Sequence, residues 1–193
     1  MRTNMEFRQT PLKNHEIWTF YFFVDSYPHL LTDGCRDIAK GKKFKEFQNW
    51  GLLYTVEFEI TVTNAGSGWT NVFHFTAEGN YDNYGDRIPA LYIDNINNQG
   101  YFHICSAING NPNYWKNFDF DLGKQYQITI KQFIENGIYW YEVIIDGESI
   151  LKIENTQPQS FSSVKLYTSD PWYNSFSSDL GSICNIRIQQ LED

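Results

Sequence analysis

The sequence has few basic side chains and no long apolar segment. Lys and Arg number 15 against 23 Asp and Glu, which gives a formal net charge of −8. A surface of that sign repels phosphate backbones and anionic lipids, so we expect no nucleic acid or membrane-surface partner. Such a surface attracts cations, and Ca²⁺ is the cation that carboxylates and carbonyls usually bind. The alternative is that the negative charge serves solubility alone. No run reaches the roughly 18 apolar residues of a membrane span.

Cysteines and sorting signals are also scarce. Residues 1–9 lack the basic segment, apolar core and cleavage site of a secretion signal, which leaves a cytosolic protein or a processed mature form. Cys35, Cys105 and Cys184 form no CxxC pair, so a zinc site is not expected. Cys105 and Cys184 lie in strand-like runs, where a cysteine is usually a small buried hydrophobe. Cys35 lies in a glycine-containing turn and could bridge a neighbouring strand.

Recognisable catalytic patterns are missing. Gly-x-Ser-x-Gly, the P-loop and His-Glu-x-x-His are absent, and the four histidines are scattered at His15, His29, His74 and His103. A retaining β-glucanase on a jelly roll needs Glu-x-Asp-x-Glu on one strand face. Glu57 and Glu59 come nearest but lack the Asp, and their simplest role is the solvated face of a strand. We therefore expect no enzyme, with glycoside hydrolysis the least favoured alternative.

What the sequence has in abundance is aromatic side chains. They make up 18% of 193 residues, as 13 Tyr, 15 Phe and 6 Trp. Aromatic residues favour pleated, half-buried surfaces, so the composition indicates β structure. The length suits a single domain with a substantial core.

Strand patterns recur at short spacing from residue 52 onward. Leu53–Val62 alternates apolar and polar residues with a period of two, and Asn136-Gly137 and Asp146-Gly147 are strong hairpin signals. The fold class is therefore all-β, a two-sheet antiparallel jelly-roll sandwich of 10 to 13 strands. Residues 46–193 form that sandwich. Residues 1–45 form a less regular arm that contributes one strand at Trp18–Val24, and the only weak helix signal, at Cys35–Phe47, is more typical of a loop.

The segment Gly79–Pro89 is dense in oxygen donors. Asp82 and Asp86, with Asn80 and backbone carbonyls, could give a hard cation such as Ca²⁺ several ligands from one loop. The alternative is an ordinary Asx-turn loop in which Asp86 and Arg87 form a surface charge pair.

Two further loops, Asn109–Trp115 and Asp170–Asn174, combine polar groups with adjacent aromatic rings. Such a combination suits sugars, whose hydroxyls bind amides or carboxylates while their apolar faces stack on rings. The alternative is that these aromatics fold back over the core. The candidate ligand-binding residues are Asp86, Arg87, Asn109, Asn111, Asn113, Tyr114, Trp115, Asp170, Trp172 and Tyr173.

Several stretches together resemble a concanavalin A-like lectin/glucanase jelly-roll domain, of a laminin-G-like variety found in invertebrate extracellular proteins. They are Ser67–Thr76, Tyr84–Tyr92, His103–Asn111, Asn155–Phe161 and Val164–Tyr173. The resemblance covers roughly residues 50 to 190. It implies two curved antiparallel sheets, an extracellular location and a non-catalytic role in adhesion or matrix contact, with a glycan or matrix polymer as partner and Ca²⁺ often near the rim. The rival expectation is a structural subunit that assembles through its own surface.

The resemblance also bears on the cysteines. Alternation places Cys184 on the same strand face as Ile186 and Ile188, pointing into the core. The first and last strands of such folds commonly lie side by side. Any disulfide should therefore join Cys35 to Cys184 and leave Cys105 buried and unpaired.

Overall fold

The protein is an all-β sandwich. The computed structural model describes residues 29–30, 34–38, 40–64, 66, 68–96, 99–172 and 179–191. These residues form thirteen strands in two antiparallel sheets and contain no helix, as the sequence predicted. Within these ranges there is accordingly no helix long and apolar enough to cross a membrane.

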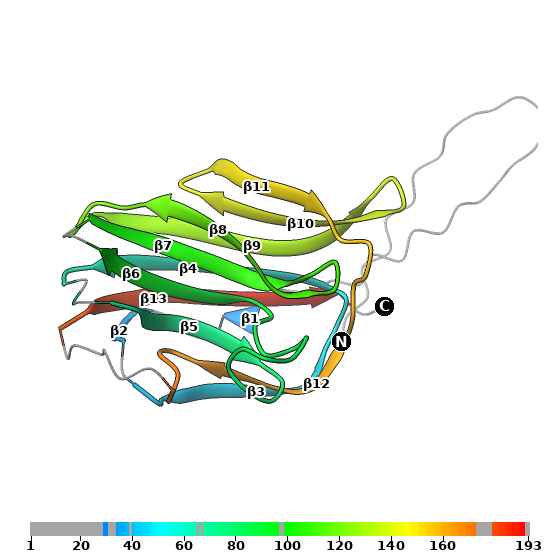
Figure 1. Ribbon diagram of the computed structural model, residues 1–193, viewed down its shortest axis with the longest axis horizontal. Coiled ribbons are helices and arrows are strands. Elements are labelled where there is room, and N and C mark those ends of the chain that lie inside the picture. Colours follow the sequence, from blue (N-terminus) through cyan, green and yellow to red (C-terminus); the bar gives the residue numbers. More distant parts are fainter. Residues whose placement is uncertain are drawn as a thin grey trace, which may run out of the picture.

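The larger sheet has seven strands. Its order is β1-β13-β4-β9-β10-β11, and β2 also pairs with β13 (Figure 1). The strands are β1 (His29–Leu30), β2 (Cys35–Asp37), β4 (Leu53–Val62), β9 (Gln125–Glu135), β10 (Ile138–Ile145), β11 (Glu148–Glu154) and β13 (Gly181–Leu191). The predicted hairpins at Asn136-Gly137 and Asp146-Gly147 are confirmed, because all four residues adopt the positive φ that such two-residue turns require.

The second sheet has six strands in the order β3-β12-β5-β6-β7-β8. They are β3 (Lys43–Trp50), β5 (Thr70–Thr76), β6 (Ala90–Ile96), β7 (Gln99–Ile108), β8 (Asn111–Asp119) and β12 (Phe161–Tyr167). In Figure 1 these strands lie over those of the larger sheet.

The core fills the space between the sheets. The alternation predicted in β4 is confirmed, since Tyr54, Val56, Phe58, Ile60 and Val62 are buried while Glu57 and Glu59 are partly exposed on the outer face. Phe58 of β4 stacks on Phe73 of β5 with ring centroids 4.7 Å apart, which joins the two layers. Burial of such side chains supplies most of the stabilisation, at about 2 kcal/mol for each.

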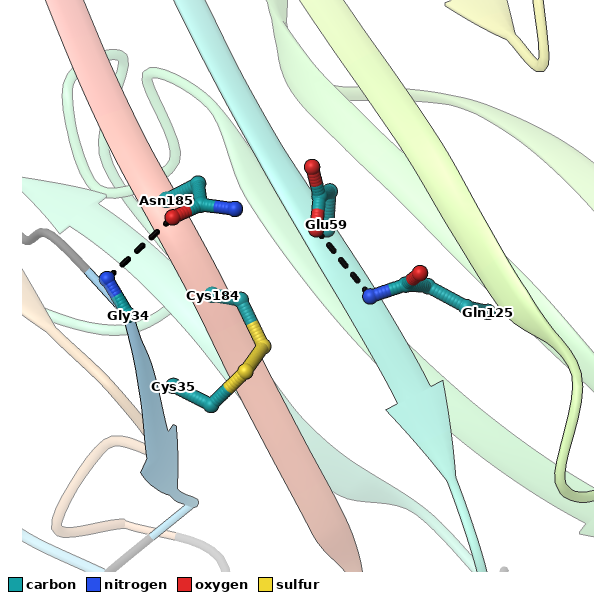
Figure 2. Close-up of a disulfide and its surroundings, with 6 residues drawn as sticks. All are labelled: Gly34, Cys35, Glu59, Gln125, Cys184 and Asn185. Atoms are coloured by element: carbon teal, nitrogen blue, oxygen red, sulfur yellow. Dashed lines mark hydrogen bonds between the residues drawn. A yellow bond between two sulfur atoms is a disulfide. The ribbon is translucent and has the colours of Figure 1, made fainter.

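The disulfide between Cys35 and Cys184 is confirmed (Figure 2). It links paired positions of β2 and β13, so β2 lies beside the last strand, as the predicted disulfide requires. Cys105 is free and buried. The predicted direction of Cys184 is wrong, because Cys184 pairs with Glu59 on the outer face, whereas Ile186 and Ile188 are part of the core. A bulge after Cys184, with Asn185 at φ 52°, reverses the alternation.

Two stretches predicted as loops are strands. Cys35–Phe47 contains β2 and most of β3, and Asn109–Trp115 is a tight turn followed by the start of β8. Pro112 argues against a strand in the sequence because proline cannot donate a backbone hydrogen bond. β8 is an edge strand, where a missing N–H is tolerated. The strand predicted at Trp18–Val24 lies outside the described residues.

Candidate functional site: an aromatic platform on the six-stranded sheet

The outer face of the six-stranded sheet carries polar and aromatic side chains that are shielded from solvent. Phe75 of β5, Leu91 of β6 and Phe102 of β7 face the core. Because side chains alternate along a strand, the neighbouring His74, Tyr92 and His103 face outward. All three are nevertheless buried, so other parts of the chain cover them.

Four exposed aromatic side chains lie over this face. They are Trp69 at 38% exposure, Tyr81 at 54%, Trp115 at 53% and Trp172 at 39%. We call these four residues, together with the Tyr92 and His103 rings beneath them, the aromatic platform. Several large aromatic side chains exposed on one face of a protein form an apolar patch of the kind that marks a binding surface.

His103 lies between two of the tryptophans. Its ring centroid is 4.8 Å from that of Trp69 and 5.2 Å from that of Trp115. The Trp69 ring makes an angle of 84° with the His103 ring, whereas the Trp115 ring is tilted by 33°. The Trp69 ring is therefore nearly perpendicular to the His103 ring, whereas the Trp115 ring is closer to parallel with it.

Arg87 connects several residues around Tyr92. Its guanidinium carbon lies 4.5 Å from the Tyr92 ring centroid and 5.0 Å from that of Tyr81. Its Nε donates to the Asn80 carbonyl at 2.9 Å, and one terminal nitrogen donates to Asn113 Oδ1 at 2.6 Å. Since Arg87 is itself buried, it positions ligand-facing residues around it.

The carboxylate of Asp86 organises its own loop. Oδ1 accepts from the Gly79 amide at 2.9 Å, and Oδ2 accepts from the Asn83 amide at 2.8 Å. The Asp86 carbonyl also contacts Nε2 of His74, which ties the loop to β5. Asp86 thus binds two amides that precede it in the chain, and because Asp86 and Arg87 are both buried they do not form the surface charge pair of the alternative prediction.

Asp170 plays a similar role for the other covering loop. Its Oδ2 lies 3.0 Å from His74 Nδ1, and its Oδ1 accepts from the Trp172 amide at 3.0 Å. The Trp172 ring then packs on His74 at a centroid distance of 5.5 Å. Asp170 is fully buried, so it fixes the position of Trp172 rather than lying in reach of a ligand.

The pKa shifts of two titratable side chains beside Trp69, His103 and Tyr101, favour their neutral forms. Burial lowers the pKa of His103, and the nearby Arg87 charge lowers it further, against the opposing effects of Asn117 and Asp94. Tyr101, beside Trp69, donates to Asp94 Oδ2 at 2.6 Å, and this hydrogen bond raises the pKa of Tyr101 to about 12. An uncharged His103 and a protonated Tyr101 suit a ligand that offers hydroxyls rather than charges.

The structure separates the remaining predicted ligand residues. Asn113 and Trp115 share the platform face, while Tyr114 packs against the core from the other face of β8. Asn109 forms the β7–β8 turn and accepts from Thr156, and Asn111 caps the Asn113 amide. Tyr173 lies outside the described residues.

The candidate cation residues lie at the rim of the platform. Asp82 is exposed, Asn80 is half-buried, and Asp86 is turned toward its two amides. Among the described residues, no group of three or more His, Cys, Asp or Glu side chains converges as a metal site would require.

Sequence reasoning missed four members of the site: Trp69, Tyr81, Tyr92 and His103. A period of two in residues 90–94 and 101–108 places Tyr92 and His103 on the face opposite the core residues, so those two could have been found. Trp69 and Tyr81 lie in connecting segments, and no local pattern indicates which face of the sandwich such segments cover.

Comparisons with known proteins bear on the fold. Comparison of the sequence with family models and with curated proteins finds no match. A heptameric SAP-like pentraxin from Limulus polyphemus superposes with a TM-score of 0.52 at 12% identity, covering 82% of this chain and 76% of that chain. The sialidase of Trypanosoma rangeli gives 0.50 at 16% identity, covering 71% of this chain and 20% of that one. An alginate lyase from Alteromonas sp.272 gives 0.46 at 12% identity, over 73% and 71% of the two chains.

At such identities the similarity concerns architecture alone, and the narrower laminin-G-like resemblance stays a prediction. The architecture itself agrees with the predicted one in its number of strands and in its two antiparallel sheets. The chain has the concanavalin A-like jelly-roll fold.

Proposed function

We propose that this protein is a non-catalytic glycan-binding module that holds its ligand on the aromatic platform. One observation carries the proposal: Trp69, Trp115 and Trp172, from three separate segments, are exposed together on one sheet face. Indole rings stack on the apolar faces of sugars, and amides such as Asn113 bind the hydroxyls at the sugar edges. This combination of apolar surface with a few placed polar groups is typical of small-molecule and carbohydrate sites.

Binding without catalysis is supported by the state of the three carboxylates beneath the platform. Glycoside hydrolysis needs two carboxyl groups that reach the scissile bond from opposite sides. Asp86 and Asp170 are buried and engaged by backbone amides, and Asp94 is buried and accepts from Tyr101. Incubation with glycans that bind, followed by chromatography of the products, tests this part, since shortened or unsaturated products would contradict it.

The Cys35–Cys184 disulfide supports an extracellular location, because disulfides persist mainly in oxidising compartments. An extracellular glycan-binding module would serve adhesion or matrix contact. The rival role is a structural subunit that assembles through its own surface. Sizing across a concentration series separates the two roles, since the rival requires assembly without sugar binding.

The experiment that tests the proposal is a glycan array followed by isothermal titration calorimetry of the best ligand. Trp115→Ala and Trp69→Ala should each weaken binding by about tenfold, which corresponds to about 1.4 kcal/mol. Ile134→Ala is the matched control, because Ile134 is 46% exposed but lies on β9 of the other sheet. Binding that survives both tryptophan substitutions, or no binding to any glycan, would refute the proposal.

A further inference from the structure

The side-chain amide of Asn113 is fixed with its nitrogen toward solvent. Arg87 donates to Asn113 Oδ1 at 2.6 Å, and a guanidinium can only donate, so the oxygen must be the atom that faces Arg87. The buried side-chain nitrogens and oxygens without a partner, within the described residues, are Trp50 Nε1 and Tyr141 OH. Asn113 Nδ2, for which the described residues offer no hydrogen-bond partner, is therefore accessible to solvent.

Asn117 repeats this arrangement two positions beyond Trp115. Its Oδ1 lies 2.8 Å from His103 Nδ1, and a neutral imidazole that donates from Nδ1 leaves Nε2 as an acceptor. By the same criterion, Asn117 Nδ2 and His103 Nε2 face solvent in the part of the chain that the structure describes. Two oriented donors and one acceptor thus surround the exposed Trp115 ring.

The spacing of these groups matches one sugar ring. Asn113, Trp115 and Asn117 alternate along β8, so each amide lies about 6.6 Å along the strand from the indole between them. A pyranose stacked on Trp115 would have its equatorial hydroxyls at both edges. Those edges would point along β8, one toward each amide nitrogen.

Further rings continue from Trp115 across the strands rather than along them. The His103 ring lies 5.2 Å from Trp115, Tyr92 lies 6.4 Å from His103, and His74 lies 6.0 Å from Tyr92. Trp172 then covers His74 at 5.5 Å. The three rings in the middle of this row are buried, so a ligand would stack on the exposed rings at its two ends, Trp115 on β8 and Trp172 over β5. Three strand spacings of about 4.8 Å separate β8 from β5, and one such spacing is close to the length of one sugar in an extended chain.

The charges beside this row disfavour an acidic polymer. Asp119 follows Asn117 on the same face of β8 and is exposed, and the protein as a whole carries a net charge of −8. A chain of uronic acids or sulfated sugars would meet repulsion at this edge of the sheet.

We propose that the ligand is an extended, uncharged polysaccharide of equatorially linked pyranoses, which lies across β5 to β8 with one sugar stacked on Trp115 between the amides of Asn113 and Asn117. This inference rests on the proposed function and adds the class of glycan and the direction of the chain. The site then binds an internal stretch of about four sugars, the length that spans the distance from Trp115 on β8 to Trp172 over β5.

The experiment is calorimetry of the full chain with length series of neutral β-linked oligosaccharides, namely gluco-, xylo-, manno- and chito-oligosaccharides of one to six sugars. Polyuronate fragments of the same lengths form the comparison series. In the series that binds best, affinity should rise up to about four sugars and then level off. Asn113→Asp keeps the oxygen that Arg87 contacts but removes the outward donor, and it should weaken binding by about tenfold.

Asn136→Asp is the matched control. It makes the same change of amide to carboxylate at an exposed position, in the β9–β10 turn of the other sheet, so affinity should stay within about twofold of the wild type. Melting temperatures of both variants verify that the fold is kept. A monosaccharide that binds as tightly as a tetrasaccharide, or a polyuronate that binds more tightly than every neutral series, would overturn the inference and leave the glycan-binding function in place. Failure of every glycan to bind would overturn both.

Discussion

Nδ1 of His74 lies 3.0 Å from Oδ2 of Asp170, 96 positions later in the chain, and both side chains are fully buried beneath the aromatic platform. This pair fastens the loop after β12 to the outer face of β5. Because the same carboxylate accepts from the Trp172 amide, the pair also determines where one of the platform tryptophans lies.

Removing this carboxylate should be costly. Asp170→Ala leaves His74 and the Trp172 amide without their shared acceptor in a buried place, so the free energy of unfolding should fall by about 3 kcal/mol. Asp170→Asn keeps the size and one oxygen and should cost about 1 kcal/mol. Urea unfolding of the three proteins measures both values. A loss of less than about 0.5 kcal/mol for Asp170→Ala, the range of ordinary surface changes, would contradict this role.

The disulfide predicts a simple thiol count. Denatured protein without reductant should expose one thiol, that of Cys105, and three after reduction. Cys184→Ser should lower the free energy of unfolding by about 3 kcal/mol, because the bridge joins residues 149 positions apart and restricts the unfolded chain. Three thiols before reduction would contradict the bridge.

Stability should depend on pH through His103. Since burial lowers the pKa of His103 below its ordinary 6.5, the unfolded chain binds a proton first as the pH falls. The wild type should therefore lose stability relative to His103→Gln below pH 6.5, while above about pH 7 their difference should stay constant. Urea unfolding from about pH 5 to 8 measures this difference. A difference that grows in favour of the wild type on acidification would mean that the pKa is raised instead.

Calcium binding at the rim stays a prediction. Each oxygen of Asp86 keeps a lone pair beyond the backbone N–H that it accepts, and the exposed Asp82 offers a second carboxylate. Millimolar Ca²⁺ should then raise the melting temperature over that in chelator, because a ligand that binds only the folded form stabilises it. Asp82→Asn should abolish the rise while leaving the melt in chelator nearly unchanged. Equal melting temperatures in Ca²⁺ and chelator would speak against the site.

The fold could be predicted from the sequence because its signals are local. Alternation in Leu53–Val62 and the Asn-Gly and Asp-Gly turns each depend on neighbouring residues, and the structure confirms them. The direction of Cys184 could not, because a single bulge residue, Asn185, reverses the faces of β13.

The candidate site was predicted only in part for a similar reason. Asn113, Trp115 and Trp172 were recognised from loop composition, although Asn113 and Trp115 belong to a strand. Their grouping with Trp69 and Tyr81 depends on which covering loops cross which sheet face. Buried contacts such as His74–Asp170 and Arg87–Asn113 determine that arrangement, and they join residues far apart in the sequence.

The most direct test of glycan binding on the aromatic platform is NMR of the tryptophan indole N–H groups. The protein is titrated with a neutral β-linked tetrasaccharide from the series that binds best. The chain has six tryptophans, so each signal can be assigned by single Trp→Phe variants. The account predicts that the signals of Trp69, Trp115 and Trp172 shift on binding, while those of the buried Trp50 and of Trp140 on the other sheet stay in place. Shifts of Trp140 without those of Trp69 and Trp115 would contradict the account, because the ligand would then lie on the opposite face of the sandwich.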